Sequence, residues 1–190
     1  MDSQRDFFQR IIGMLERAGI SYMVAGSLSS SYYGKPRSSQ DVDIVIDPDR
    51  NSLGKLIDLL APEYYVSRPA AIEAMEHRGM FNIIDTHIGW KVDLVIRKAR
   101  PFSQEEFTRR RPAELMGVQT WVLSPEDSIL SKLEWAKGRE SVLQLQDAIH
   151  VMITQWNTLD MEYLRRWAPV LDIVRELDAI IEQARSQKGE

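Results

Sequence analysis

The chain contains no cysteine among its 190 residues. This absence excludes disulfide bonds, thiolate ligands for zinc and a cysteine nucleophile. Long apolar runs are also missing, and none approaches the roughly 20 residues that a membrane-spanning helix needs. The first residues, MDSQRDFFQR, lack the apolar core of a secretory signal peptide. From these absences we expect a cytoplasmic protein with no membrane partner.

A large excess of either charge is absent as well, because 24 basic and 28 acidic residues give a formal net charge of -4. This balance argues against a broad surface for duplex nucleic acid, but it allows a local basic site around one phosphorylated ligand. With 44% hydrophobic residues, the chain can bury one substantial core with a small appended subdomain.

The apolar patterns predict an α/β domain over residues 1–123 and a helical subdomain over residues 124–190. Expected strands of the first part cover residues 21–26 and 41–47 and a hairpin over 81–96, and expected helices cover 6–18, 51–60, 69–77 and 103–111. Expected helices of the second part cover 125–137, 141–154, 160–167 and 169–184. We expect Asn51 to cap its helix, and Ser124 followed by Pro125 is a strong helix start.

Two aspartates, Asp41 and Asp43, open the apolar stretch DVDIVID. Side chains alternate along a strand, so both carboxylates point to the same side. Two like charges this close either raise one pKa or require a cation between them, and hard oxygen ligands suit Mg²⁺ or Mn²⁺. The alternative is that both carboxylates simply face water on a half-exposed strand.

A third aspartate, Asp93, lies inside the apolar stretch KVDLVI. If that strand lies beside DVDIVID, the three carboxylates converge in the way that two-metal sites require. Asp85, in FNIID, is a competing candidate, but it adjoins the expected hairpin turn. A solvent-facing acid at a strand end is the alternative interpretation of Asp93.

A Gly-Ser step, Gly26 and Ser27, follows the first expected strand. Glycine allows close approach of the backbone to a ligand, and a serine that opens a helix offers a hydroxyl and N–H groups to phosphate. Lys35 and Arg37, in the loop before Asp41, are candidates for charge-assisted bonds to phosphate oxygens. A plain strand-to-helix turn and a solvated loop are the alternatives.

Together these residues resemble the nucleotidyltransferase superfamily typified by DNA polymerase β, in particular its small prokaryotic members. The superfamily pattern is an apolar strand, Gly-Gly or Gly-Ser, an Asp-x-Asp about a dozen residues later, and a third acid in a later apolar strand. Gly26 and Ser27, then Asp41 and Asp43, then Asp93 match it over about the first 120 residues. The resemblance implies an α+β (α/β) nucleotidyltransferase fold, with a small mixed sheet flanked by helices and a C-terminal helical bundle.

The helical part is similar to that of nucleotidyltransferases from toxin-antitoxin and phage-abortive systems. In those proteins a lysine after a Pro-Glu-Asp-like helix start and an aspartate on the next helix belong to the site. Lys132 and Asp147 occupy these positions in SPEDSILSKLEWAKGRESVLQLQDAIH. The alternative is that Lys132 is an exposed helix charge and that Asp147 pairs with a neighbour.

The resemblance implies transfer of a nucleoside monophosphate from a nucleoside triphosphate to an acceptor hydroxyl, with release of pyrophosphate. Asp41 and Asp43 would bind both metal ions, and Asp93 would share one of them and could take up the proton. Gly26 and Ser27 would hold phosphates. Lys35, Arg37, Lys132 and Asp147 complete the expected nucleotide site.

Two hypotheses follow for the function. The first is an active enzyme that uses Mg²⁺ or Mn²⁺ and a hydroxyl acceptor on a protein, an RNA or a small molecule. The second is a catalytically inactive member that serves as an interaction module with a partner protein, for example a toxin-antitoxin component.

Overall fold

The computed structural model describes residues 4–39, 41–61, 63–137 and 141–189. Its contacts divide the chain into two compact units. One comprises Met1–Ala25 and Ser39–Val122, and the other comprises Gly26–Ser38 and Leu123–Glu190. The sequence predicted a single boundary, between residues 123 and 124. The contacts change from one unit to the other between Val122 and Leu123, and they group Gly26–Ser38 with the C-terminal helices.

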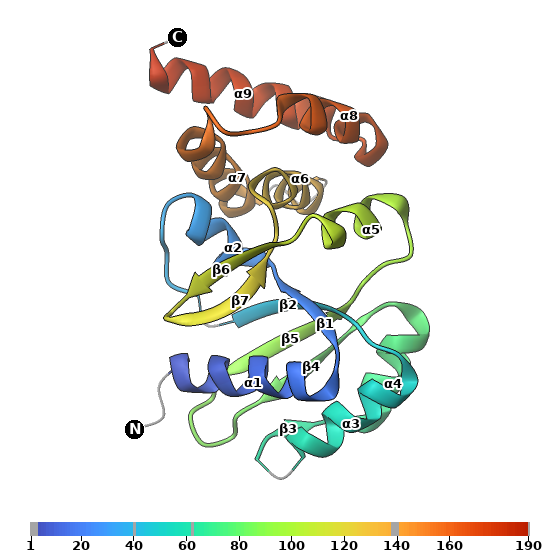
Figure 1. Cartoon of the computed structure of the whole chain (residues 1–190). Helices are drawn as coiled ribbons and strands as arrows, with labels where there is room; N and C mark the ends of the chain where they lie inside the picture. The colour runs from blue at the N-terminus through green and yellow to red at the C-terminus, as the bar shows by residue number, and fades with distance from the viewer. Residues whose placement is uncertain (1–3, 40, 62, 138–140, 190) are drawn as a thin grey trace. The chain divides into compact units, whose positions relative to one another are not determined.

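Within the described residues, seven strands of the first unit form one mixed sheet in the order β3-β4-β5-β2-β1-β7-β6 (Figure 1). The strands are β1 (Ser21–Val24), β2 (Asp41–Asp47), β3 (Tyr65–Val66), β4 (Met80–Ile84), β5 (Lys91–Ile96), β6 (Arg111–Leu115) and β7 (Val118–Val122). The central strands β2 and β5 are parallel, whereas β2 pairs antiparallel with β1 and β5 pairs antiparallel with β4. The expected mixed sheet is therefore present.

Alternation along β2 separates the core from the polar side of the sheet. Val42, Ile44 and Ile46 are buried, whereas Asp41 is exposed and Asp43 half-buried. β-Branched side chains pack well on a pleated surface, which favours this strand in the middle of a sheet. Residues 111–122 form a hairpin of β6 and β7. Its turn residues, Met116 and Gly117, both have positive φ angles, as type I′ turns require.

The helices of the sheet unit are α1 (Gln4–Ala18), α3 (Arg50–Leu60), α4 (Arg68–His77) and α5 (Pro101–Thr108). The prediction that Asn51 caps the second of them is wrong. Asp49 is the cap, because its side chain accepts a hydrogen bond from the Ser52 N–H while the Ser52 hydroxyl accepts one from the Asp49 N–H. The helix expected over residues 103–111 ends at Thr108, and β6 begins at Arg111.

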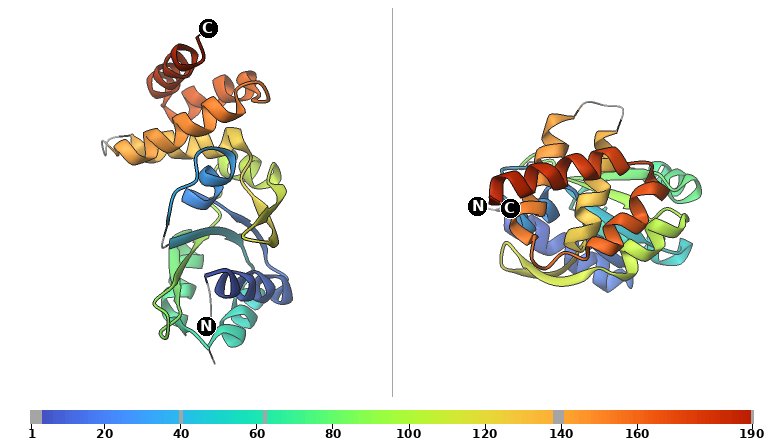
Figure 2. Two further views of the ribbon diagram at one scale, coloured as in Figure 1. Left: turned by 90° about the vertical axis from the view of Figure 1, so that its left-hand side faces the viewer. Right: turned by 90° about the horizontal axis from the view of Figure 1, so that it is seen from above.

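The second unit contains α2 (Gly26–Tyr33), α6 (Pro125–Ala136), α7 (Val142–Gln155), α8 (Met161–Leu171) and α9 (Val174–Lys188). α2 packs against α6 and α7 (Figure 2). The approach is close, because a Cβ atom at Gly34 would lie 2.9 Å from the Val151 backbone nitrogen. This packing explains why Gly26–Ser38 groups with residues far away in the sequence.

The expected helix break at Pro169 is wrong. Pro169 lies within α8, near its C-terminal end, where its missing N–H removes only one helical hydrogen bond. The helix ends instead at Leu171. The next residue, Asp172, has a φ of +56°, and its N–H donates to the carbonyls of Ala168 and Pro169. Over the described ranges, no helix is both long and apolar enough to cross a membrane.

The start of α6 gives a prediction about stability. The buried Ser124 hydroxyl accepts a hydrogen bond from the Asp127 N–H at 3.1 Å and donates one to the Asp127 carboxylate at 2.6 Å. Ser124→Ala should therefore lower the free energy of unfolding by about 1 kcal/mol in urea titrations. Ser141 precedes α7 without a side-chain capping bond, so Ser141→Ala should have little effect. Equal losses in both variants would contradict this account of the cap.

Candidate active site

The three predicted catalytic aspartates lie on one side of two adjacent parallel strands. In the pairing of β2 with β5, Asp41 lies opposite Lys91 and Asp43 lies opposite Asp93. Directly opposite residues of paired strands point to the same face of a sheet. The Ala25 N–H, just after β1, donates to the Asp43 carbonyl at 2.9 Å, so the end of β1 lies beside Asp43. We call Asp41, Asp43 and Asp93 the acidic edge.

Asp93 is the most buried member of the acidic edge, and neighbouring side chains engage both of its carboxylate oxygens. The Asn82 amide donates a hydrogen bond to Oδ1, from the position opposite Asp93 on β4. The Lys91 ammonium lies 3.1 Å from Oδ2. The Asp93 side chain is 10% exposed, compared with 55% for Asp41. These contacts hold Asp93 in a fixed orientation at the sheet surface.

Lys91 connects two members of the acidic edge. Its Nζ lies 3.6 Å from Oδ1 of Asp41 and 3.1 Å from Oδ2 of Asp93. Burial by itself lowers the pKa of Lys91, but hydrogen bonds and charge from Asp93, followed by those from Asp41, outweigh burial and raise it above the usual lysine range. Lys91 is therefore a charged ammonium held between two carboxylates.

The residue types at the acidic edge suit a hard divalent cation, because carboxylate and amide oxygens are the ligands that Mg²⁺ prefers. Among the residues that the structure describes, however, no group of three or more His, Cys, Asp or Glu side chains is gathered closely enough to hold a metal ion. The ammonium of Lys91 lies between Asp41 and Asp93 instead. The oxygen ligands at the acidic edge thus fit a metal ion, but in this structure their side chains are arranged around the ammonium of Lys91.

Asp85, the competing candidate, has a different environment. It is buried, and its Oδ1 accepts hydrogen bonds from the His87 N–H at 2.9 Å and the Ile88 N–H at 3.3 Å. An aspartate that binds backbone N–H groups two and three residues ahead stabilises a turn. Asp85 also lies one residue beyond the end of β4 at Ile84. Its contacts are those of the hairpin turn.

The second unit brings together Lys132, Asp147 and Arg37, three of the predicted nucleotide-binding residues. Lys132 Nζ donates to Asp147 Oδ2 at 2.7 Å, and Arg37 makes two parallel bonds to the same carboxylate at 3.0 Å each. Ser30 donates a further bond to Asp147 at 3.3 Å. We call these four residues the Asp147 cluster. It carries one more positive than negative charge.

Burial shapes the electrostatics of the Asp147 cluster. Lys132 and Asp147 are both buried, with side chains only 6% exposed. Burial by itself raises the pKa of Asp147, but hydrogen bonds from Arg37 and Lys132 and their positive charges outweigh it and lower the pKa below the ordinary aspartate range. Of the alternative interpretation, an exposed Lys132 is excluded, whereas the pairing of Asp147 with neighbours is present.

The remaining predicted phosphate ligands lie at the two ends of the segment that contains α2. Gly26 begins the helix with a φ of +58°, a conformation that favours glycine. Ser27 follows it and is buried, and its carbonyl accepts a bond from the Ser30 hydroxyl. Lys35 is exposed after the helix, unlike the half-buried Arg37. Arg37 thus contacts Asp147, the partner of Lys132. Within the described part of the chain, Lys35 makes no hydrogen bond or ion pair with the Asp147 cluster.

Sequence reasoning missed three residues of these two groups. Lys91 precedes Asp93 by two positions, so strand alternation alone places both side chains on one face, and this signal was available. Asn82 meets Asp93 only because of the register of the β4–β5 hairpin. Ser30 reaches Asp147 from a serine-rich helix in which no pattern singles it out.

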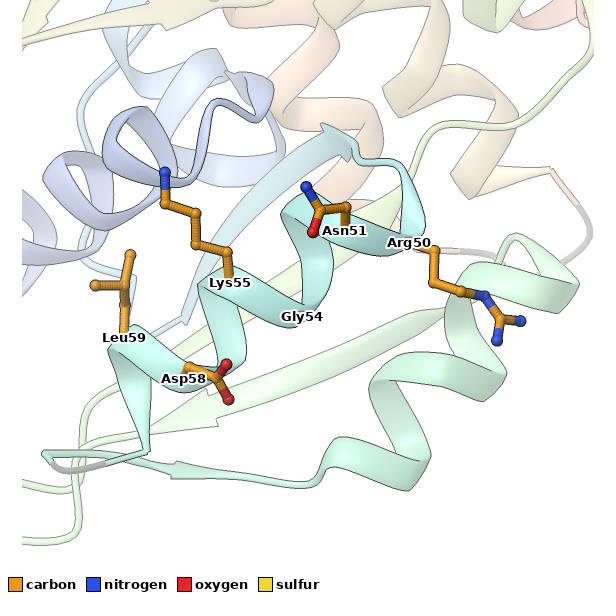
Figure 3. A pocket seen from close by; sticks show the side chains of 6 residues that line it. All are labelled: Arg50, Asn51, Gly54, Lys55, Asp58 and Leu59. Carbon is orange, nitrogen blue, oxygen red and sulfur yellow. The ribbon is translucent and has the colours of Figure 1, made fainter.

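A shallow hollow of about 450 Å³ runs along α3 in the sheet unit (Figure 3). It is lined by Arg50, Asn51, Gly54, Lys55, Asp58 and Leu59. All six belong to one helix, which follows the end of β2 opposite to Asp41. The hollow therefore lies apart from the acidic edge.

No protein-family model matches the chain, and no curated protein matches its sequence. Solved structures do match. An antigenic nucleotidyltransferase-like protein from Paracoccidioides brasiliensis aligns with a TM-score of 0.57 at 16% identity, over 94% of this chain and 91% of the other. The antibiotic-resistance factor ANT(2″)-Ia, in complex with adenylyl-2″-tobramycin, aligns with a TM-score of 0.61 at 11% identity, over 90% and 98%.

The lincosamide antibiotic adenylyltransferase LnuA, with lincomycin bound, aligns with a TM-score of 0.51 at 12% identity, over 80% of this chain and 96% of the other. These identities are low, so the likeness is one of fold. The chain has the nucleotidyltransferase fold, and the prediction of this fold from the Gly-Ser step and the three aspartates is confirmed.

The Asp147 cluster gives a prediction about pH. Asp147→Asn leaves the buried Lys132 without its counter-charge, and we expect a loss of about 3 kcal/mol in unfolding free energy at neutral pH. Because the folded-state pKa of Asp147 is lowered, its contribution is complete above about pH 4 and is lost as the pH falls through the lowered pKa. Urea titrations of both proteins should therefore converge as the solution becomes more acidic.

The control for this experiment is Asp172→Asn. Asp172 pairs with Lys137 at the exposed surface of the same unit, where water screens the interaction. This variant should unfold close to wild type at neutral pH. A difference between wild type and Asp147→Asn that stays constant into acid would contradict the assigned role of the carboxylate.

Proposed function

We propose that this protein is a metal-dependent nucleotidyltransferase that transfers a nucleoside monophosphate from a nucleoside triphosphate to an acceptor hydroxyl. The observation that carries the proposal is the register of β2 and β5, which sets Asp43 opposite Asp93 and Asp41 on the same face, in a chain with the nucleotidyltransferase fold. A solvated acidic strand would not require a third carboxylate on the neighbouring strand, directly opposite Asp43.

In the proposed reaction, the acceptor oxygen attacks the α-phosphorus of the triphosphate. A new P–O bond forms, the bond from the α-phosphorus to the bridging oxygen breaks, and pyrophosphate leaves. The proton of the hydroxyl passes to a carboxylate of the acidic edge, for which Asp93 is our candidate. A bound Mg²⁺ or Mn²⁺ supplies charge neutralisation and lowers the pKa of the attacking hydroxyl.

The exposed Asp41 and the half-buried Asp43 are the proposed cation ligands of the sheet unit. Asp41 is the most accessible of the acidic edge, so its carboxylate can reorient toward an arriving ion. Asn82 and Lys91 fix Asp93, which would share one of the bound ions with Asp41 and Asp43. Each role requires the ionised carboxylate.

The proposed phosphate-binding residues belong to the second unit. Gly26 and Ser27 begin α2, where backbone N–H groups at a helix start attract anions. The excess positive charge of the Asp147 cluster suits the β- and γ-phosphates, and Arg37, with its side chain 27% exposed, is its more accessible cation. Lys35 would add a further exposed positive charge.

Small molecules that carry hydroxyl groups are the first class of acceptor to test. Two of the fold neighbours contain an adenylylated antibiotic or a bound antibiotic, and this chain covers nearly all of each of them. A hydroxyl on a protein or an RNA would meet the same carboxylates. Incubation with each radiolabelled nucleoside triphosphate, with small hydroxyl compounds and then with whole-cell lysate, will show which class becomes labelled.

The carboxylates provide the direct test. Asp43→Asn, alone and with Asp41→Asn, should lower monophosphate transfer at least about 100-fold, which corresponds to about 2.7 kcal/mol of transition-state stabilisation. The same variants should abolish the rise in Tm that Mg²⁺ and a nucleoside triphosphate give with wild type. Label transfer and thermal unfolding are the two measurements.

Asp47 is the matched control in this test, because it lies at the other end of β2, on the same face. It pairs with Arg97 at 2.9 Å and with Arg78 at 3.7 Å, away from the acidic edge. Asp47→Asn should keep transfer within a few-fold of wild type. Transfer that survives in the Asp43→Asn variant would sink the proposed function.

The engagement of Lys91 with Asp41 and Asp93 favours a second candidate, a catalytically inactive interaction module of the toxin-antitoxin kind. In this case the ammonium would permanently occupy the place of the cation. The protein would then show no Mn²⁺ binding and no label transfer, and it would purify in a tight complex with the product of a neighbouring gene. Mn²⁺ binding at the acidic edge separates the two candidates.

A further inference from the structure

We infer that Lys91 is an internal counter-cation of the acidic edge, which a divalent ion must displace and which therefore sets how tightly the metal binds. This inference rests on the proposed function in one respect, the presence of a metal at the acidic edge. It adds a residue that competes with the metal, whereas the proposed function concerns only the residues that bind it.

The position of Lys91 supports this role. Its strand partner is Asp41 and its neighbour along the same face is Asp93, so its side chain leaves the backbone between the two carboxylates. Nζ lies 3.6 Å and 3.1 Å from their oxygens. These are the distances of ion pairs. The ammonium of Lys91 therefore places a single positive charge between the two carboxylates.

The surroundings explain why a cation is needed there when no metal is bound. Asp41, Asp43 and Asp93 bring three negative charges to one end of two strands, and Asp93 is buried. Carboxylates on neighbouring positions of adjacent strands repel one another, and burial increases the free energy needed to keep them ionised. Asn82 satisfies one oxygen of Asp93 but contributes no charge. Lys91 supplies the charge from within the chain.

The same geometry sets up a competition. A divalent ion that binds Asp41 and Asp93 would lie within a few ångströms of the ammonium, and the two cations repel each other. The Lys91 side chain is one third exposed and has four flexible carbons, so it can swing toward solvent. Metal binding then costs the two ion pairs of Lys91, and the metal affinity is lower than the carboxylates alone would give.

The test measures Mn²⁺ binding without nucleotide, from the electron paramagnetic resonance signal of free Mn²⁺. Lys91→Met removes the charge and keeps an unbranched stem. It should tighten Mn²⁺ binding at least about tenfold. In the presence of EDTA, its Tm should fall below that of wild type, and saturating Mn²⁺ should raise its Tm by more than it raises that of wild type. Lys91→Gln serves as a second neutral variant if Lys91→Met does not fold.

Three control variants accompany the measurement. Lys91→Arg keeps the charge and should bind Mn²⁺ about as weakly as wild type. Lys98→Met removes an exposed lysine beyond the opposite end of β5 and should change the affinity little, which controls for net charge. Adding Asp43→Asn to Lys91→Met should abolish the gain, which locates the ion at the acidic edge.

The outcomes separate this inference from the proposed function. The inference is supported if Mn²⁺ binds more tightly to the neutral Lys91 variants but not to Lys91→Arg or Lys98→Met. It is also supported if Mn²⁺ binding is detected only when Lys91 is replaced by a neutral residue. Equal or weaker binding in the neutral variants overturns the inference and leaves the proposed function standing. A complete absence of Mn²⁺ binding in every variant overturns both.

Discussion

The parallel pairing of β2 with β5 is the constraint on which the rest of the acidic edge depends. Buried apolar residues on one face hold this register, among them Ile44 opposite Leu94 and Ile46 opposite Ile96. A slip by one residue would turn the side chains of β5 to the opposite face, so that Asp93 would enter the core. The apolar core and the polar site are thus two consequences of a single alignment.

This dependence also explains why the opposite face can hold so many charges. Packing of the apolar residues fixes the backbone, and the carboxylates gain their positions without contributing to that packing. Asp93 is then stabilised by Lys91 and Asn82 from the neighbouring positions of its own strand and of β4. The strand register places Lys91 and Asn82 close enough to Asp93 to offset the repulsion between the carboxylates.

Most of the sheet could be predicted from the sequence because its strands have strong local signals. The stretch DVDIVID is apolar, β-branched and followed by proline, and β2 covers it from Asp41 to Asp47. β3 spans only Tyr65–Val66 and is defined by its pairing with β4, which no local pattern reveals. The break predicted at Pro169 failed because a proline near the end of a helix removes only one hydrogen bond.

The residues of the candidate site could be predicted where strand alternation or motif spacing places them. They were harder to predict where tertiary contacts determine which side chains meet. The Gly-Ser step and the aspartates pointed to the fold that the structure has. The grouping of Arg37 with Lys132 and Asp147 depends on the packing of α2 on the C-terminal helices. Asp147 lies 110 residues after Arg37 in the sequence. Lys91 was predictable from strand alternation, because it precedes Asp93 by two positions, but the acidic motif does not include it.

The packing of α2 against α6 and α7 has a consequence for how the protein is made. Gly26–Ser38 is synthesised early, whereas its packing partners lie beyond residue 123. The buried side of α2, which includes Ser29 and Ser30, stays uncovered until those helices leave the ribosome. A truncated chain that stops before α6 would therefore leave this helix without its partners, so dissection of the protein should keep both segments in one chain.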